Sequence, residues 1–405
     1  MLVIYSLIGL RNIRRNFRRS LLAVLAISFG LFCLIVFQAL KVGLHREMMH
    51  STLNLDPGTI QIHAKGYEAN IAVLQPIEQH EELTAILAKD GFHPSAERLK
   101  TPALLLAGRK SSSVLLSGIR PEQEKQITFI GAKTVAGSYL KNPGTLFIGE
   151  TLAASLEVGV GDSVMLMAQS MYGKPVTRRL PVGGIFRTKS ASFDRNHIYT
   201  DLATAQSMLE ASNVITEIAL QTDHDAVESI AGKLRQRLNP ELFQVRAWQV
   251  IIPDLKQLIE LNDATMGLLV FIVFAIVAMG IANTMTTAIF ERFREFGTMT
   301  AIGTTPGGIV TIVVLESFFL GLIAVLVGTL AGTIACTWLS RYGLDLSSFI
   351  SSNQYFAEDH VLKAYLLPGD LLRAVFITLV TAVLAGIYPA WKASRLDPVK
   401  AIAHT

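Results

Sequence analysis

The chain has 405 residues, of which 51% are hydrophobic and only 17% charged, with a formal net charge of +4. A soluble domain carries about a quarter charged residues, so this composition excludes an ordinary soluble protein. The mean hydropathy of +0.42 comes from four long apolar stretches, while the middle of the chain has a mixed composition. The basic residues stand beside the apolar stretches, where they face anionic membrane lipids, so the positive charge does not indicate a nucleic acid partner.

The first 20 residues combine an apolar and a basic face. Leu7, Leu10, Phe17 and Leu21 recur at helical spacing, with arginines between them. This pattern predicts a helix that lies on the cytoplasmic surface of the membrane. A basic segment that only sets the orientation of the chain is an equally good interpretation.

Four apolar stretches are each long enough to cross a membrane as a helix, which requires roughly 20 residues. They cover residues 21–43, 264–289, 308–339 and 371–390. The third is so long that it needs a tilt or an extension into the cytoplasm. No A-x-A cleavage site follows the first stretch, so we expect an uncleaved anchor rather than a signal peptide.

The orientation follows from lysines and arginines near the spans, because these residues stay on the cytoplasmic side. Five arginines precede the first span, Arg292 and Arg294 lie between the second and third, and Lys392 and Arg395 follow the fourth. The connection between the third and fourth spans is acidic instead. Both termini are therefore predicted to be cytoplasmic, and residues 44–262 to lie outside.

The external segment predicts an α+β domain. Strand-like runs cover residues 59–63, 114–119, 146–150, 163–168, 182–186, 197–199, 216–221 and 243–247. Helices are expected at residues 151–156, 202–212 and 226–238, with a βαβ-like order at the end. The fold class is thus a membrane protein of four helices with a large α+β domain between the first two.

No motif for chemistry is found in the sequence. H-E-x-x-H, G-x-S-x-G and Cys-x-x-Cys are absent, and so is the phosphate-binding loop G-x-x-x-x-G-K-[ST]. We therefore predict no catalytic residue, metal site or directly bound cofactor in this chain. If the protein is driven by ATP, the nucleotide must be bound by another polypeptide.

The connection between the second and third spans, residues 290–306, is short and strongly charged. It reads F-E-R-F-R-E-F-G-T-M-T-A-I-G-T-T-P, which predicts that the second span stays helical into a charged turn before the chain bends back at Gly303. Such an elbow suits docking into a groove on a cytoplasmic partner. On physical grounds alone, a simple loop with charges for topology explains it equally well.

Two stretches carry a resemblance to a known family. The run N-T-M-x-x-A-x-x-E-R-x-R-E-F-G-x-M-x-A-I-G at residues 283–303 and the ending Y-P-A-W-K-A-S-R-L-D-P-V-K-A-I at residues 388–402 resemble the permease family of LolC/LolE, MacB and FtsX. The layout of one span, a large external domain and three further spans is also similar. Residues 116–119 and 148–162 resemble the periplasmic core of that family.

The resemblance implies a permease subunit of an ATP-binding-cassette transporter in the bacterial inner membrane, itself not an enzyme. Its expected partners are a cytoplasmic ATPase dimer that binds ATP and Mg²⁺, and a second copy or paralogue of the permease. In that family the elbow fits into the ATPase. The implied coupling residues here are Glu291, Arg292, Arg294, Glu295, Phe296, Gly297, Met299, Ile302, Gly303 and Pro306.

Length and layout look most similar to the lipoprotein-releasing LolC/LolE permeases. A MacB-like exporter of peptides or small hydrophobic compounds and an FtsX-like regulator of a cell-wall hydrolase are the alternatives. In LolC a hairpin recruits a periplasmic lipoprotein carrier. The matching residues here are Tyr172, Gly173, Lys174 and Pro175, although an ordinary β-hairpin is the simpler interpretation.

A lipoprotein permease also needs an acyl-chain cavity within the membrane. We expect it between the first and second spans, lined by Ile27, Leu31, Leu34, Ile35, Met266, Leu269 and Phe274. Glu316 is a carboxylate inside the third span, which makes it a functional candidate. Pairing with an N-terminal arginine near the membrane surface is an equally good interpretation. Gly328 and Gly332 form a G-x-x-x-G that favours close helix packing.

Overall fold

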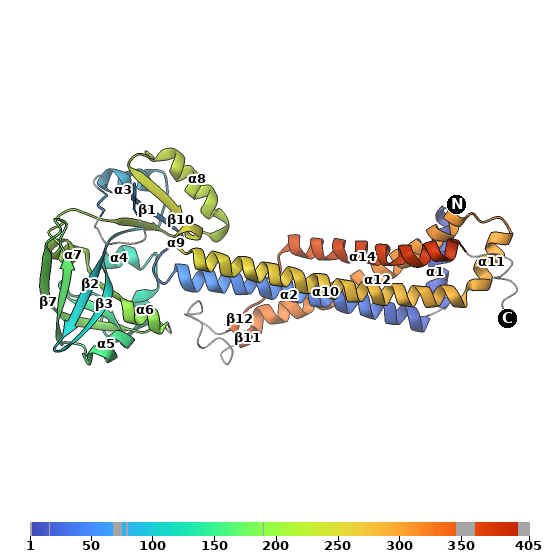
Figure 1. Ribbon diagram of the computed structural model, residues 1–405, viewed down its shortest axis with the longest axis horizontal. Helices are drawn as coiled ribbons and strands as arrows, with labels where there is room; N and C mark the ends of the chain where they lie inside the picture. The colour runs from blue at the N-terminus through green and yellow to red at the C-terminus, as the bar shows by residue number, and fades with distance from the viewer. Residues whose placement is uncertain are drawn as a thin grey trace. The chain divides into compact units, whose positions relative to one another are not determined.

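The computed structural model describes residues 2–15, 17–67, 75–77, 80–188, 190–345 and 361–395. The chain divides into two compact units (Figure 1), each described here by itself. The helical unit comprises the described residues up to His45, Ile259–Asp345 and those from Val361 onward. The α+β domain comprises Arg46–Leu258.

The helical unit contains the four long apolar helices that the sequence predicts. They are α2 (Phe17–Leu53), α10 (Pro253–Glu291), α12 (Pro306–Tyr342) and α14 (Pro368–Ser394), each long and apolar enough to cross a membrane. All four begin or end beyond the apolar runs, because the flanking polar residues also favour helix. Shorter elements are α1 (Leu2–Arg15), α11 (Phe293–Ala301) and the antiparallel pair β11 (Leu344–Asp345) and β12 (Val361–Leu362).

Small residues let α12 approach its neighbours closely. A Cβ added to Gly321 would lie 2.9 Å from the Cβ of Ala382 on α14. A Cβ on Gly328 would lie 2.8 Å from the carbonyl oxygen of Ser28 on α2, and one on Gly332 would lie 3.0 Å from Ile35. The close packing predicted from the G-x-x-x-G is confirmed.

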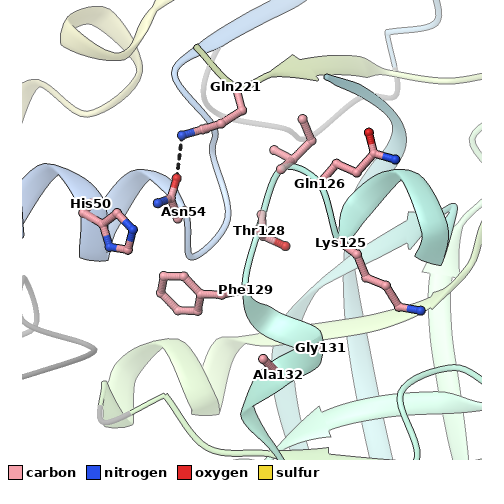
Figure 2. A pocket seen from close by; sticks show the side chains of 10 residues that line it. His50, Asn54, Lys125, Gln126, Thr128, Phe129, Gly131, Ala132 and Gln221 are labelled. Carbon is pink, nitrogen blue, oxygen red and sulfur yellow. Dashed lines mark hydrogen bonds between the residues drawn. The ribbon is translucent and has the colours of Figure 1, made fainter. Parts of the chain in front are cut away.

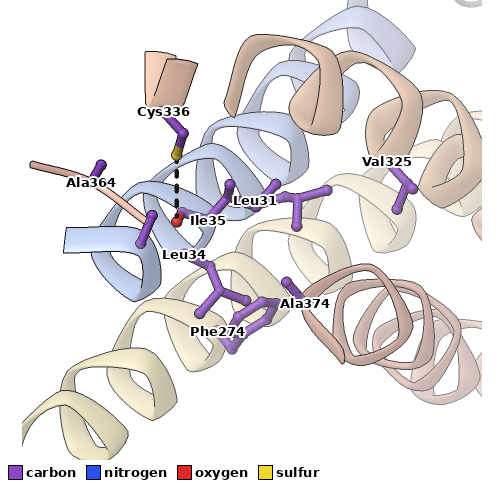
Figure 3. Packing of buried hydrophobic residues seen from close by; sticks show 9 residues of the cluster. Leu31, Leu34, Ile35, Phe274, Val325, Cys336, Ala364 and Ala374 are labelled. Atoms are coloured by element: carbon purple, nitrogen blue, oxygen red, sulfur yellow. Dashed lines mark hydrogen bonds between the residues drawn. The ribbon is translucent and has the colours of Figure 1, made fainter. Parts of the chain in front are cut away.

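Large apolar side chains fill the spaces between these contacts (Figure 3). One cluster joins Leu31, Leu34 and Ile35 of α2 to Phe274 of α10 and Ala374 of α14, together with Val325, Cys336 and Ala364. The thiol of Cys336 donates to the carbonyl oxygen of Ile35 at 3.8 Å. The core of the helical unit is therefore formed by all four long helices.

The α+β domain contains a ten-stranded sheet in the order β10-β1-β9-β2-β3-β8-β5-β7-β4. The tenth strand, β6, pairs with both β2 and β7, so that β2, β3, β8, β5, β7 and β6 close into a ring. The bounds are β1 Ile60–Ala64, β2 Ser95–Ala107, β3 Lys110–Ile119, β4 Thr134–Gly137, β5 Leu146–Gly149, β6 Ser163–Gln169, β7 Pro175–Phe186, β8 His197–Asp201, β9 Glu217–Leu220 and β10 Phe243–Ala247.

Short helices pack against the sheet, both at the ring of six strands and at the strands outside it. They are α3 His80–Lys89, α4 Pro121–Glu124, α5 Glu150–Leu156, α6 Ala191–Asn196, α7 Leu202–Met208, α8 Val227–Arg237 and α9 Trp248–Ile251, with one-turn 3₁₀ segments at Ile130–Lys133 and His224–Ala226. The βαβ-like order expected at the end is confirmed: β9 and β10 both run antiparallel to β1, which lies between them, and α8 connects them. The α+β class is therefore confirmed, although the sequence did not predict β2, β4, α3 or α6.

Candidate functional site

The elbow between α10 and α12 is a separate short helix. The helix α10 ends at Glu291, and Arg292 leaves the helical path with φ −103° and ψ 16° before α11 begins. At the other end Gly303 has φ +96°, a conformation that side chains with a Cβ disfavour. Thr305 then caps α12 by accepting a hydrogen bond from the N–H of Gly308, with Pro306 in the first turn.

The inner face of α11 packs into the helical unit. Phe296 is 1% exposed and belongs to a cluster with Ile309 and Val313 of α12 and with Ala390 and Ala393 of α14. The elbow and the C-terminal motif, the two stretches on which the resemblance rests, also contact each other through Lys392, whose ammonium lies 5.0 Å from the centroid of the Phe290 ring. This packing holds α11 against the cytoplasmic ends of two membrane helices.

Arg292 lies at the centre of an ionic network. It is 6% exposed, and it donates to Glu316 on α12 at 3.0 Å and to Glu295 on α11 at 3.1 Å. Its guanidinium carbon lies 4.9 Å from the centroid of the Phe296 ring. Asn12 of α1 donates to the same Glu316 oxygen at 3.4 Å. The partner of Glu316 is therefore an elbow arginine rather than an N-terminal one.

Two further ion pairs attach the N-terminal residues to the elbow. Arg15 of α1 pairs with Glu295, and Arg19 at the start of α2 pairs with Glu291 through both of its terminal nitrogens. Burial alone raises the pKa of Glu295, but the hydrogen bonds from Arg292 and Arg15 outweigh it and hold its pKa below the usual range. Glu295 is therefore ionised at neutral pH.

The ten residues predicted to couple to an ATPase divide into three groups. Arg292, Phe296 and Gly297 are buried by the chain itself, and Glu295 and Met299 are half-buried. Ile302 is 78% exposed. The exposed residues are Glu291, Arg294, Ile302, Gly303 and Pro306. This last group, together with the Glu295 side chain, which is 43% exposed, forms the surface that a partner could contact without displacing the elbow.

Five of the seven predicted acyl-chain residues belong to two separate buried clusters. Ile27 packs with Ile281 and Leu320, in a cluster separate from that of Leu31, Leu34, Ile35 and Phe274. Leu34, Leu269 and Phe274 line a cavity of about 10 Å³, which holds at most one water molecule. Met266 is half-buried, and Leu269 is 44% exposed. The acyl-chain site therefore stays a prediction.

The predicted carrier hairpin is formed by β6, β7 and a tight turn. The N–H of Gly173 donates to the Ser170 carbonyl at 2.9 Å, and the N–H of Met171 donates to the Leu209 carbonyl at 2.9 Å, which ties the tip to the end of α7. Tyr172 is 71% exposed. Gly173, Lys174 and Pro175 are also exposed. The tip is a fixed, accessible surface, and carrier binding there stays a prediction.

Two cavities that sequence reasoning did not find lie in the α+β domain. The larger, about 420 Å³, is lined by the end of α2, by residues 125–132 and by Gln221 (Figure 2). Gln221 donates to the side-chain oxygen of Asn54 at 2.6 Å, whereas its own side-chain oxygen is buried with no partner among the described residues. A second cavity of about 300 Å³ lies beside Asp56 and His197. No sequence motif marks either place.

A buried charge cluster lies next to these cavities. Arg98 donates to Glu124 at 2.7 Å and to Glu217 at 2.6 Å, and Lys100 donates to Asp56 at 2.8 Å. Burial alone raises the pKa of Asp56, but Lys100 and Arg98 outweigh it and hold that pKa well below its usual range. Asp56 follows α2 by only three residues, so this cluster anchors the end of that helix to the sheet.

No group of three or more metal-binding side chains is found within the described ranges. What the chain offers instead is a membrane-spanning helical unit, a packed elbow with an exposed outer face, and an α+β domain. This combination is typical of a multi-pass membrane protein with a large domain outside the membrane.

Comparison with known families identifies the class. Residues 20–237 match the MacB-like periplasmic core domain, and residues 267–398 match the FtsX-like permease C-terminal family. The first match covers more than half of the chain. The chain therefore belongs to the LolC/LolE–MacB–FtsX family of permeases of ATP-binding-cassette transporters. It is a multi-pass protein of the bacterial inner membrane, with its α+β domain on the periplasmic side.

Among known proteins, the chain is similar to members of two branches of this family. It is 24% identical to the lipoprotein-releasing system transmembrane protein LolC of Xylella fastidiosa, over 98% of each chain. It is 22% identical to LolE of Haemophilus influenzae, over 94% of this chain and 93% of that one. It is 23% identical to the macrolide export ATP-binding/permease protein MacB of Hyphomonas neptunium, over 97% of this chain and 59% of that one.

Proposed function

We propose that this chain is the permease subunit of a lipoprotein-releasing transporter. In this proposal a separate cytoplasmic ATPase dimer binds ATP and Mg²⁺, and its closure moves the elbow. A second permease, either another copy or a paralogue, completes the membrane part. The observation that carries the proposal is the similarity to LolC over 98% of both chains, at an identity of 24%.

The geometry of the elbow supports the ATPase partner. Arg294 lies exposed on the short helix α11 and Ile302 lies exposed directly after its end, whereas Phe296 on α11 is buried in a cluster with residues of α12 and α14. A rigid helix with one free face suits insertion into a groove of a partner protein. The exposed hairpin tip at Tyr172 and Lys174 supports a periplasmic carrier as the protein that receives the lipoprotein.

The test is to purify the full chain from its native membrane in mild detergent and to identify by mass spectrometry what accompanies it. We expect a cytoplasmic ATPase and acylated proteins, and we expect ATP to release the acylated proteins to a soluble periplasmic carrier. A preparation from cells that lack the chain is the control.

Other cargo would contradict the lipoprotein proposal in a defined way. Non-acylated peptides or small hydrophobic compounds would indicate a MacB-like exporter instead. A cell-wall hydrolase without transported cargo would indicate an FtsX-like regulator.

A further inference from the structure

Two arginines of the elbow that are only two positions apart lie in opposite environments. Arg292 is 6% exposed, and its side chain contacts Glu295 and Phe296 of α11 and Glu316 of α12. Arg294 is exposed on α11. Arg292 precedes the first residue of α11 and Arg294 is the second residue of that helix, so the two side chains leave the backbone in different directions. Arg292 and Arg294 are therefore expected to have different roles.

The elbow is joined to its neighbours by two non-helical connections. Arg292 alone separates α10 from α11, and residues 302–305, which include Gly303 at φ +96°, separate α11 from α12. Torsions at these connections can change the angle of α11 without breaking hydrogen bonds inside any helix. Side-chain contacts must therefore fix this angle.

The contacts of Arg292 meet this requirement. Its Nη1 donates to Glu316 at 3.0 Å and its Nε donates to Glu295 at 3.1 Å, while the Phe296 ring covers the guanidinium. A guanidinium is planar and presents its donors in fixed directions, so these contacts define its orientation. Both Arg292 and Glu316 are buried, so salt in the cytoplasm screens their attraction only weakly.

We propose that Arg292 is a positioning residue for coupling. By pairing with Glu316 it holds α11 at a fixed angle to α12, so that a displacement imposed on the outer face of α11 also moves α12. The proposal rests on the proposed function, in which the ATPase imposes that displacement. Arg294 belongs to the surface that receives the motion, and Arg292 transmits it.

The same network includes the N-terminal helix. Asn12 shares the Glu316 carboxylate, and Arg15 pairs with Glu295. A motion of α11 therefore also pulls on α1. Through these contacts α1 also supports the position of the elbow.

The test uses the full chain purified with its ATPase and reconstituted with a co-purified acylated protein. The variants are Arg292→Gln, Glu316→Gln and the exchange Arg292→Glu with Glu316→Arg. Arg294→Gln is the comparison on the outer face. Arg187→Gln, which removes an exposed ion pair with Glu150 in the α+β domain, is the control. Two quantities are measured: the amount of ATPase that co-purifies, and the acylated protein released per ATP hydrolysed.

We expect Arg292→Gln and Glu316→Gln to lower release per ATP about tenfold, a typical size for a coupling effect, while the ATPase still co-purifies. The exchange should restore part of the coupling, because it restores the pair. Arg294→Gln should lower the amount of bound ATPase instead. Loss of the ATPase from Arg292→Gln, with no recovery in the exchange, would show that Arg292 contacts the partner and would overturn the proposal.

A second measurement does not depend on cargo. Spin labels at Thr298 on α11 and Leu326 on α12, in a chain whose two cysteines are replaced, report the angle between the helices by their distance distribution. We expect a narrow distribution with Arg292 and a broad one with Arg292→Gln. Equal widths would overturn the positioning role. If the unchanged chain binds no ATPase at all, the proposed function fails instead, and the two failures are thereby distinguished.

Discussion

Arg98 lies inside the α+β domain with none of its surface exposed. Its guanidinium is held by Glu124 and Glu217, each within 3.0 Å. Burial alone lowers the pKa of Arg98, but these carboxylates outweigh it and raise that pKa well above its usual value. A buried ion cluster of this kind lowers the stability of the fold little as long as every charge has its partner. It lowers the stability strongly once one partner is missing.

We therefore expect Arg98→Leu to destabilise the α+β domain by about 3–5 kcal/mol, because it leaves the buried Glu124 without its ion-pair partner and Glu217 with Lys100 alone. The free energy of unfolding, measured by denaturant titration of the full chain in detergent, checks this value. Arg187→Leu is the matched control, since its pair with Glu150 is exposed to solvent and should contribute little to stability. Equal effects of the two substitutions would contradict the assignment.

The residues of the elbow show which features of the site could be predicted from the sequence and which could not. The charged elbow and its motif predicted where coupling takes place. The different environments of Arg292 and Arg294 could not be predicted, because they depend on the backbone torsions at the helix break at Arg292, which no local sequence pattern specifies. Arg292 was not predicted as the partner of Glu316 for the same reason. The sequence suggested an arginine near the N-terminus instead.

At the scale of elements, the glycines of α12 decide how close the membrane helices come. An added Cβ at Gly328 would meet α2 within 2.8 Å, whereas one at Gly280 of α10 would meet nothing within 4 Å. We expect Gly328→Leu to destabilise the helical unit by about 1–3 kcal/mol through overpacking. Gly280→Leu should have little effect.

Resistance to unfolding by SDS, followed by circular dichroism, measures both glycine variants under one condition. If Gly280→Leu is as damaging as Gly328→Leu, the close approach of α2 and α12 is not what makes the glycine necessary.

Strands were predicted well where side chains alternate or form a continuous apolar run, as in β3, β6 and β8. The strand β2 was not predicted because it carries Glu97, Arg98 and Lys100, residues typical of a surface. All three are buried, since partners from other elements neutralise their charges. A strand stabilised by long-range ion pairs has no local signature.

At the scale of the whole molecule, the arrangement of charge along the chain determines which side of the membrane each part occupies. Tyr172 lies in the α+β domain and Arg294 in the elbow. In a chain whose two natural cysteines are replaced, we expect Tyr172→Cys to react with a maleimide that cannot cross the inner membrane, in cells whose outer layers are permeable. Arg294→Cys should react only after the inner membrane is opened. The reverse labelling pattern would show that the topology is the opposite of the one described.

The ring of six strands limits the number of free strand edges in the α+β domain. Each strand of the ring pairs with a neighbour on both sides over at least part of its length, and among the described strands of this sheet only β10 and β4 stand at an end. Free edges are where chains stick to one another by strand addition. A periplasmic domain built in this way offers neighbouring proteins few free strand edges for aggregation.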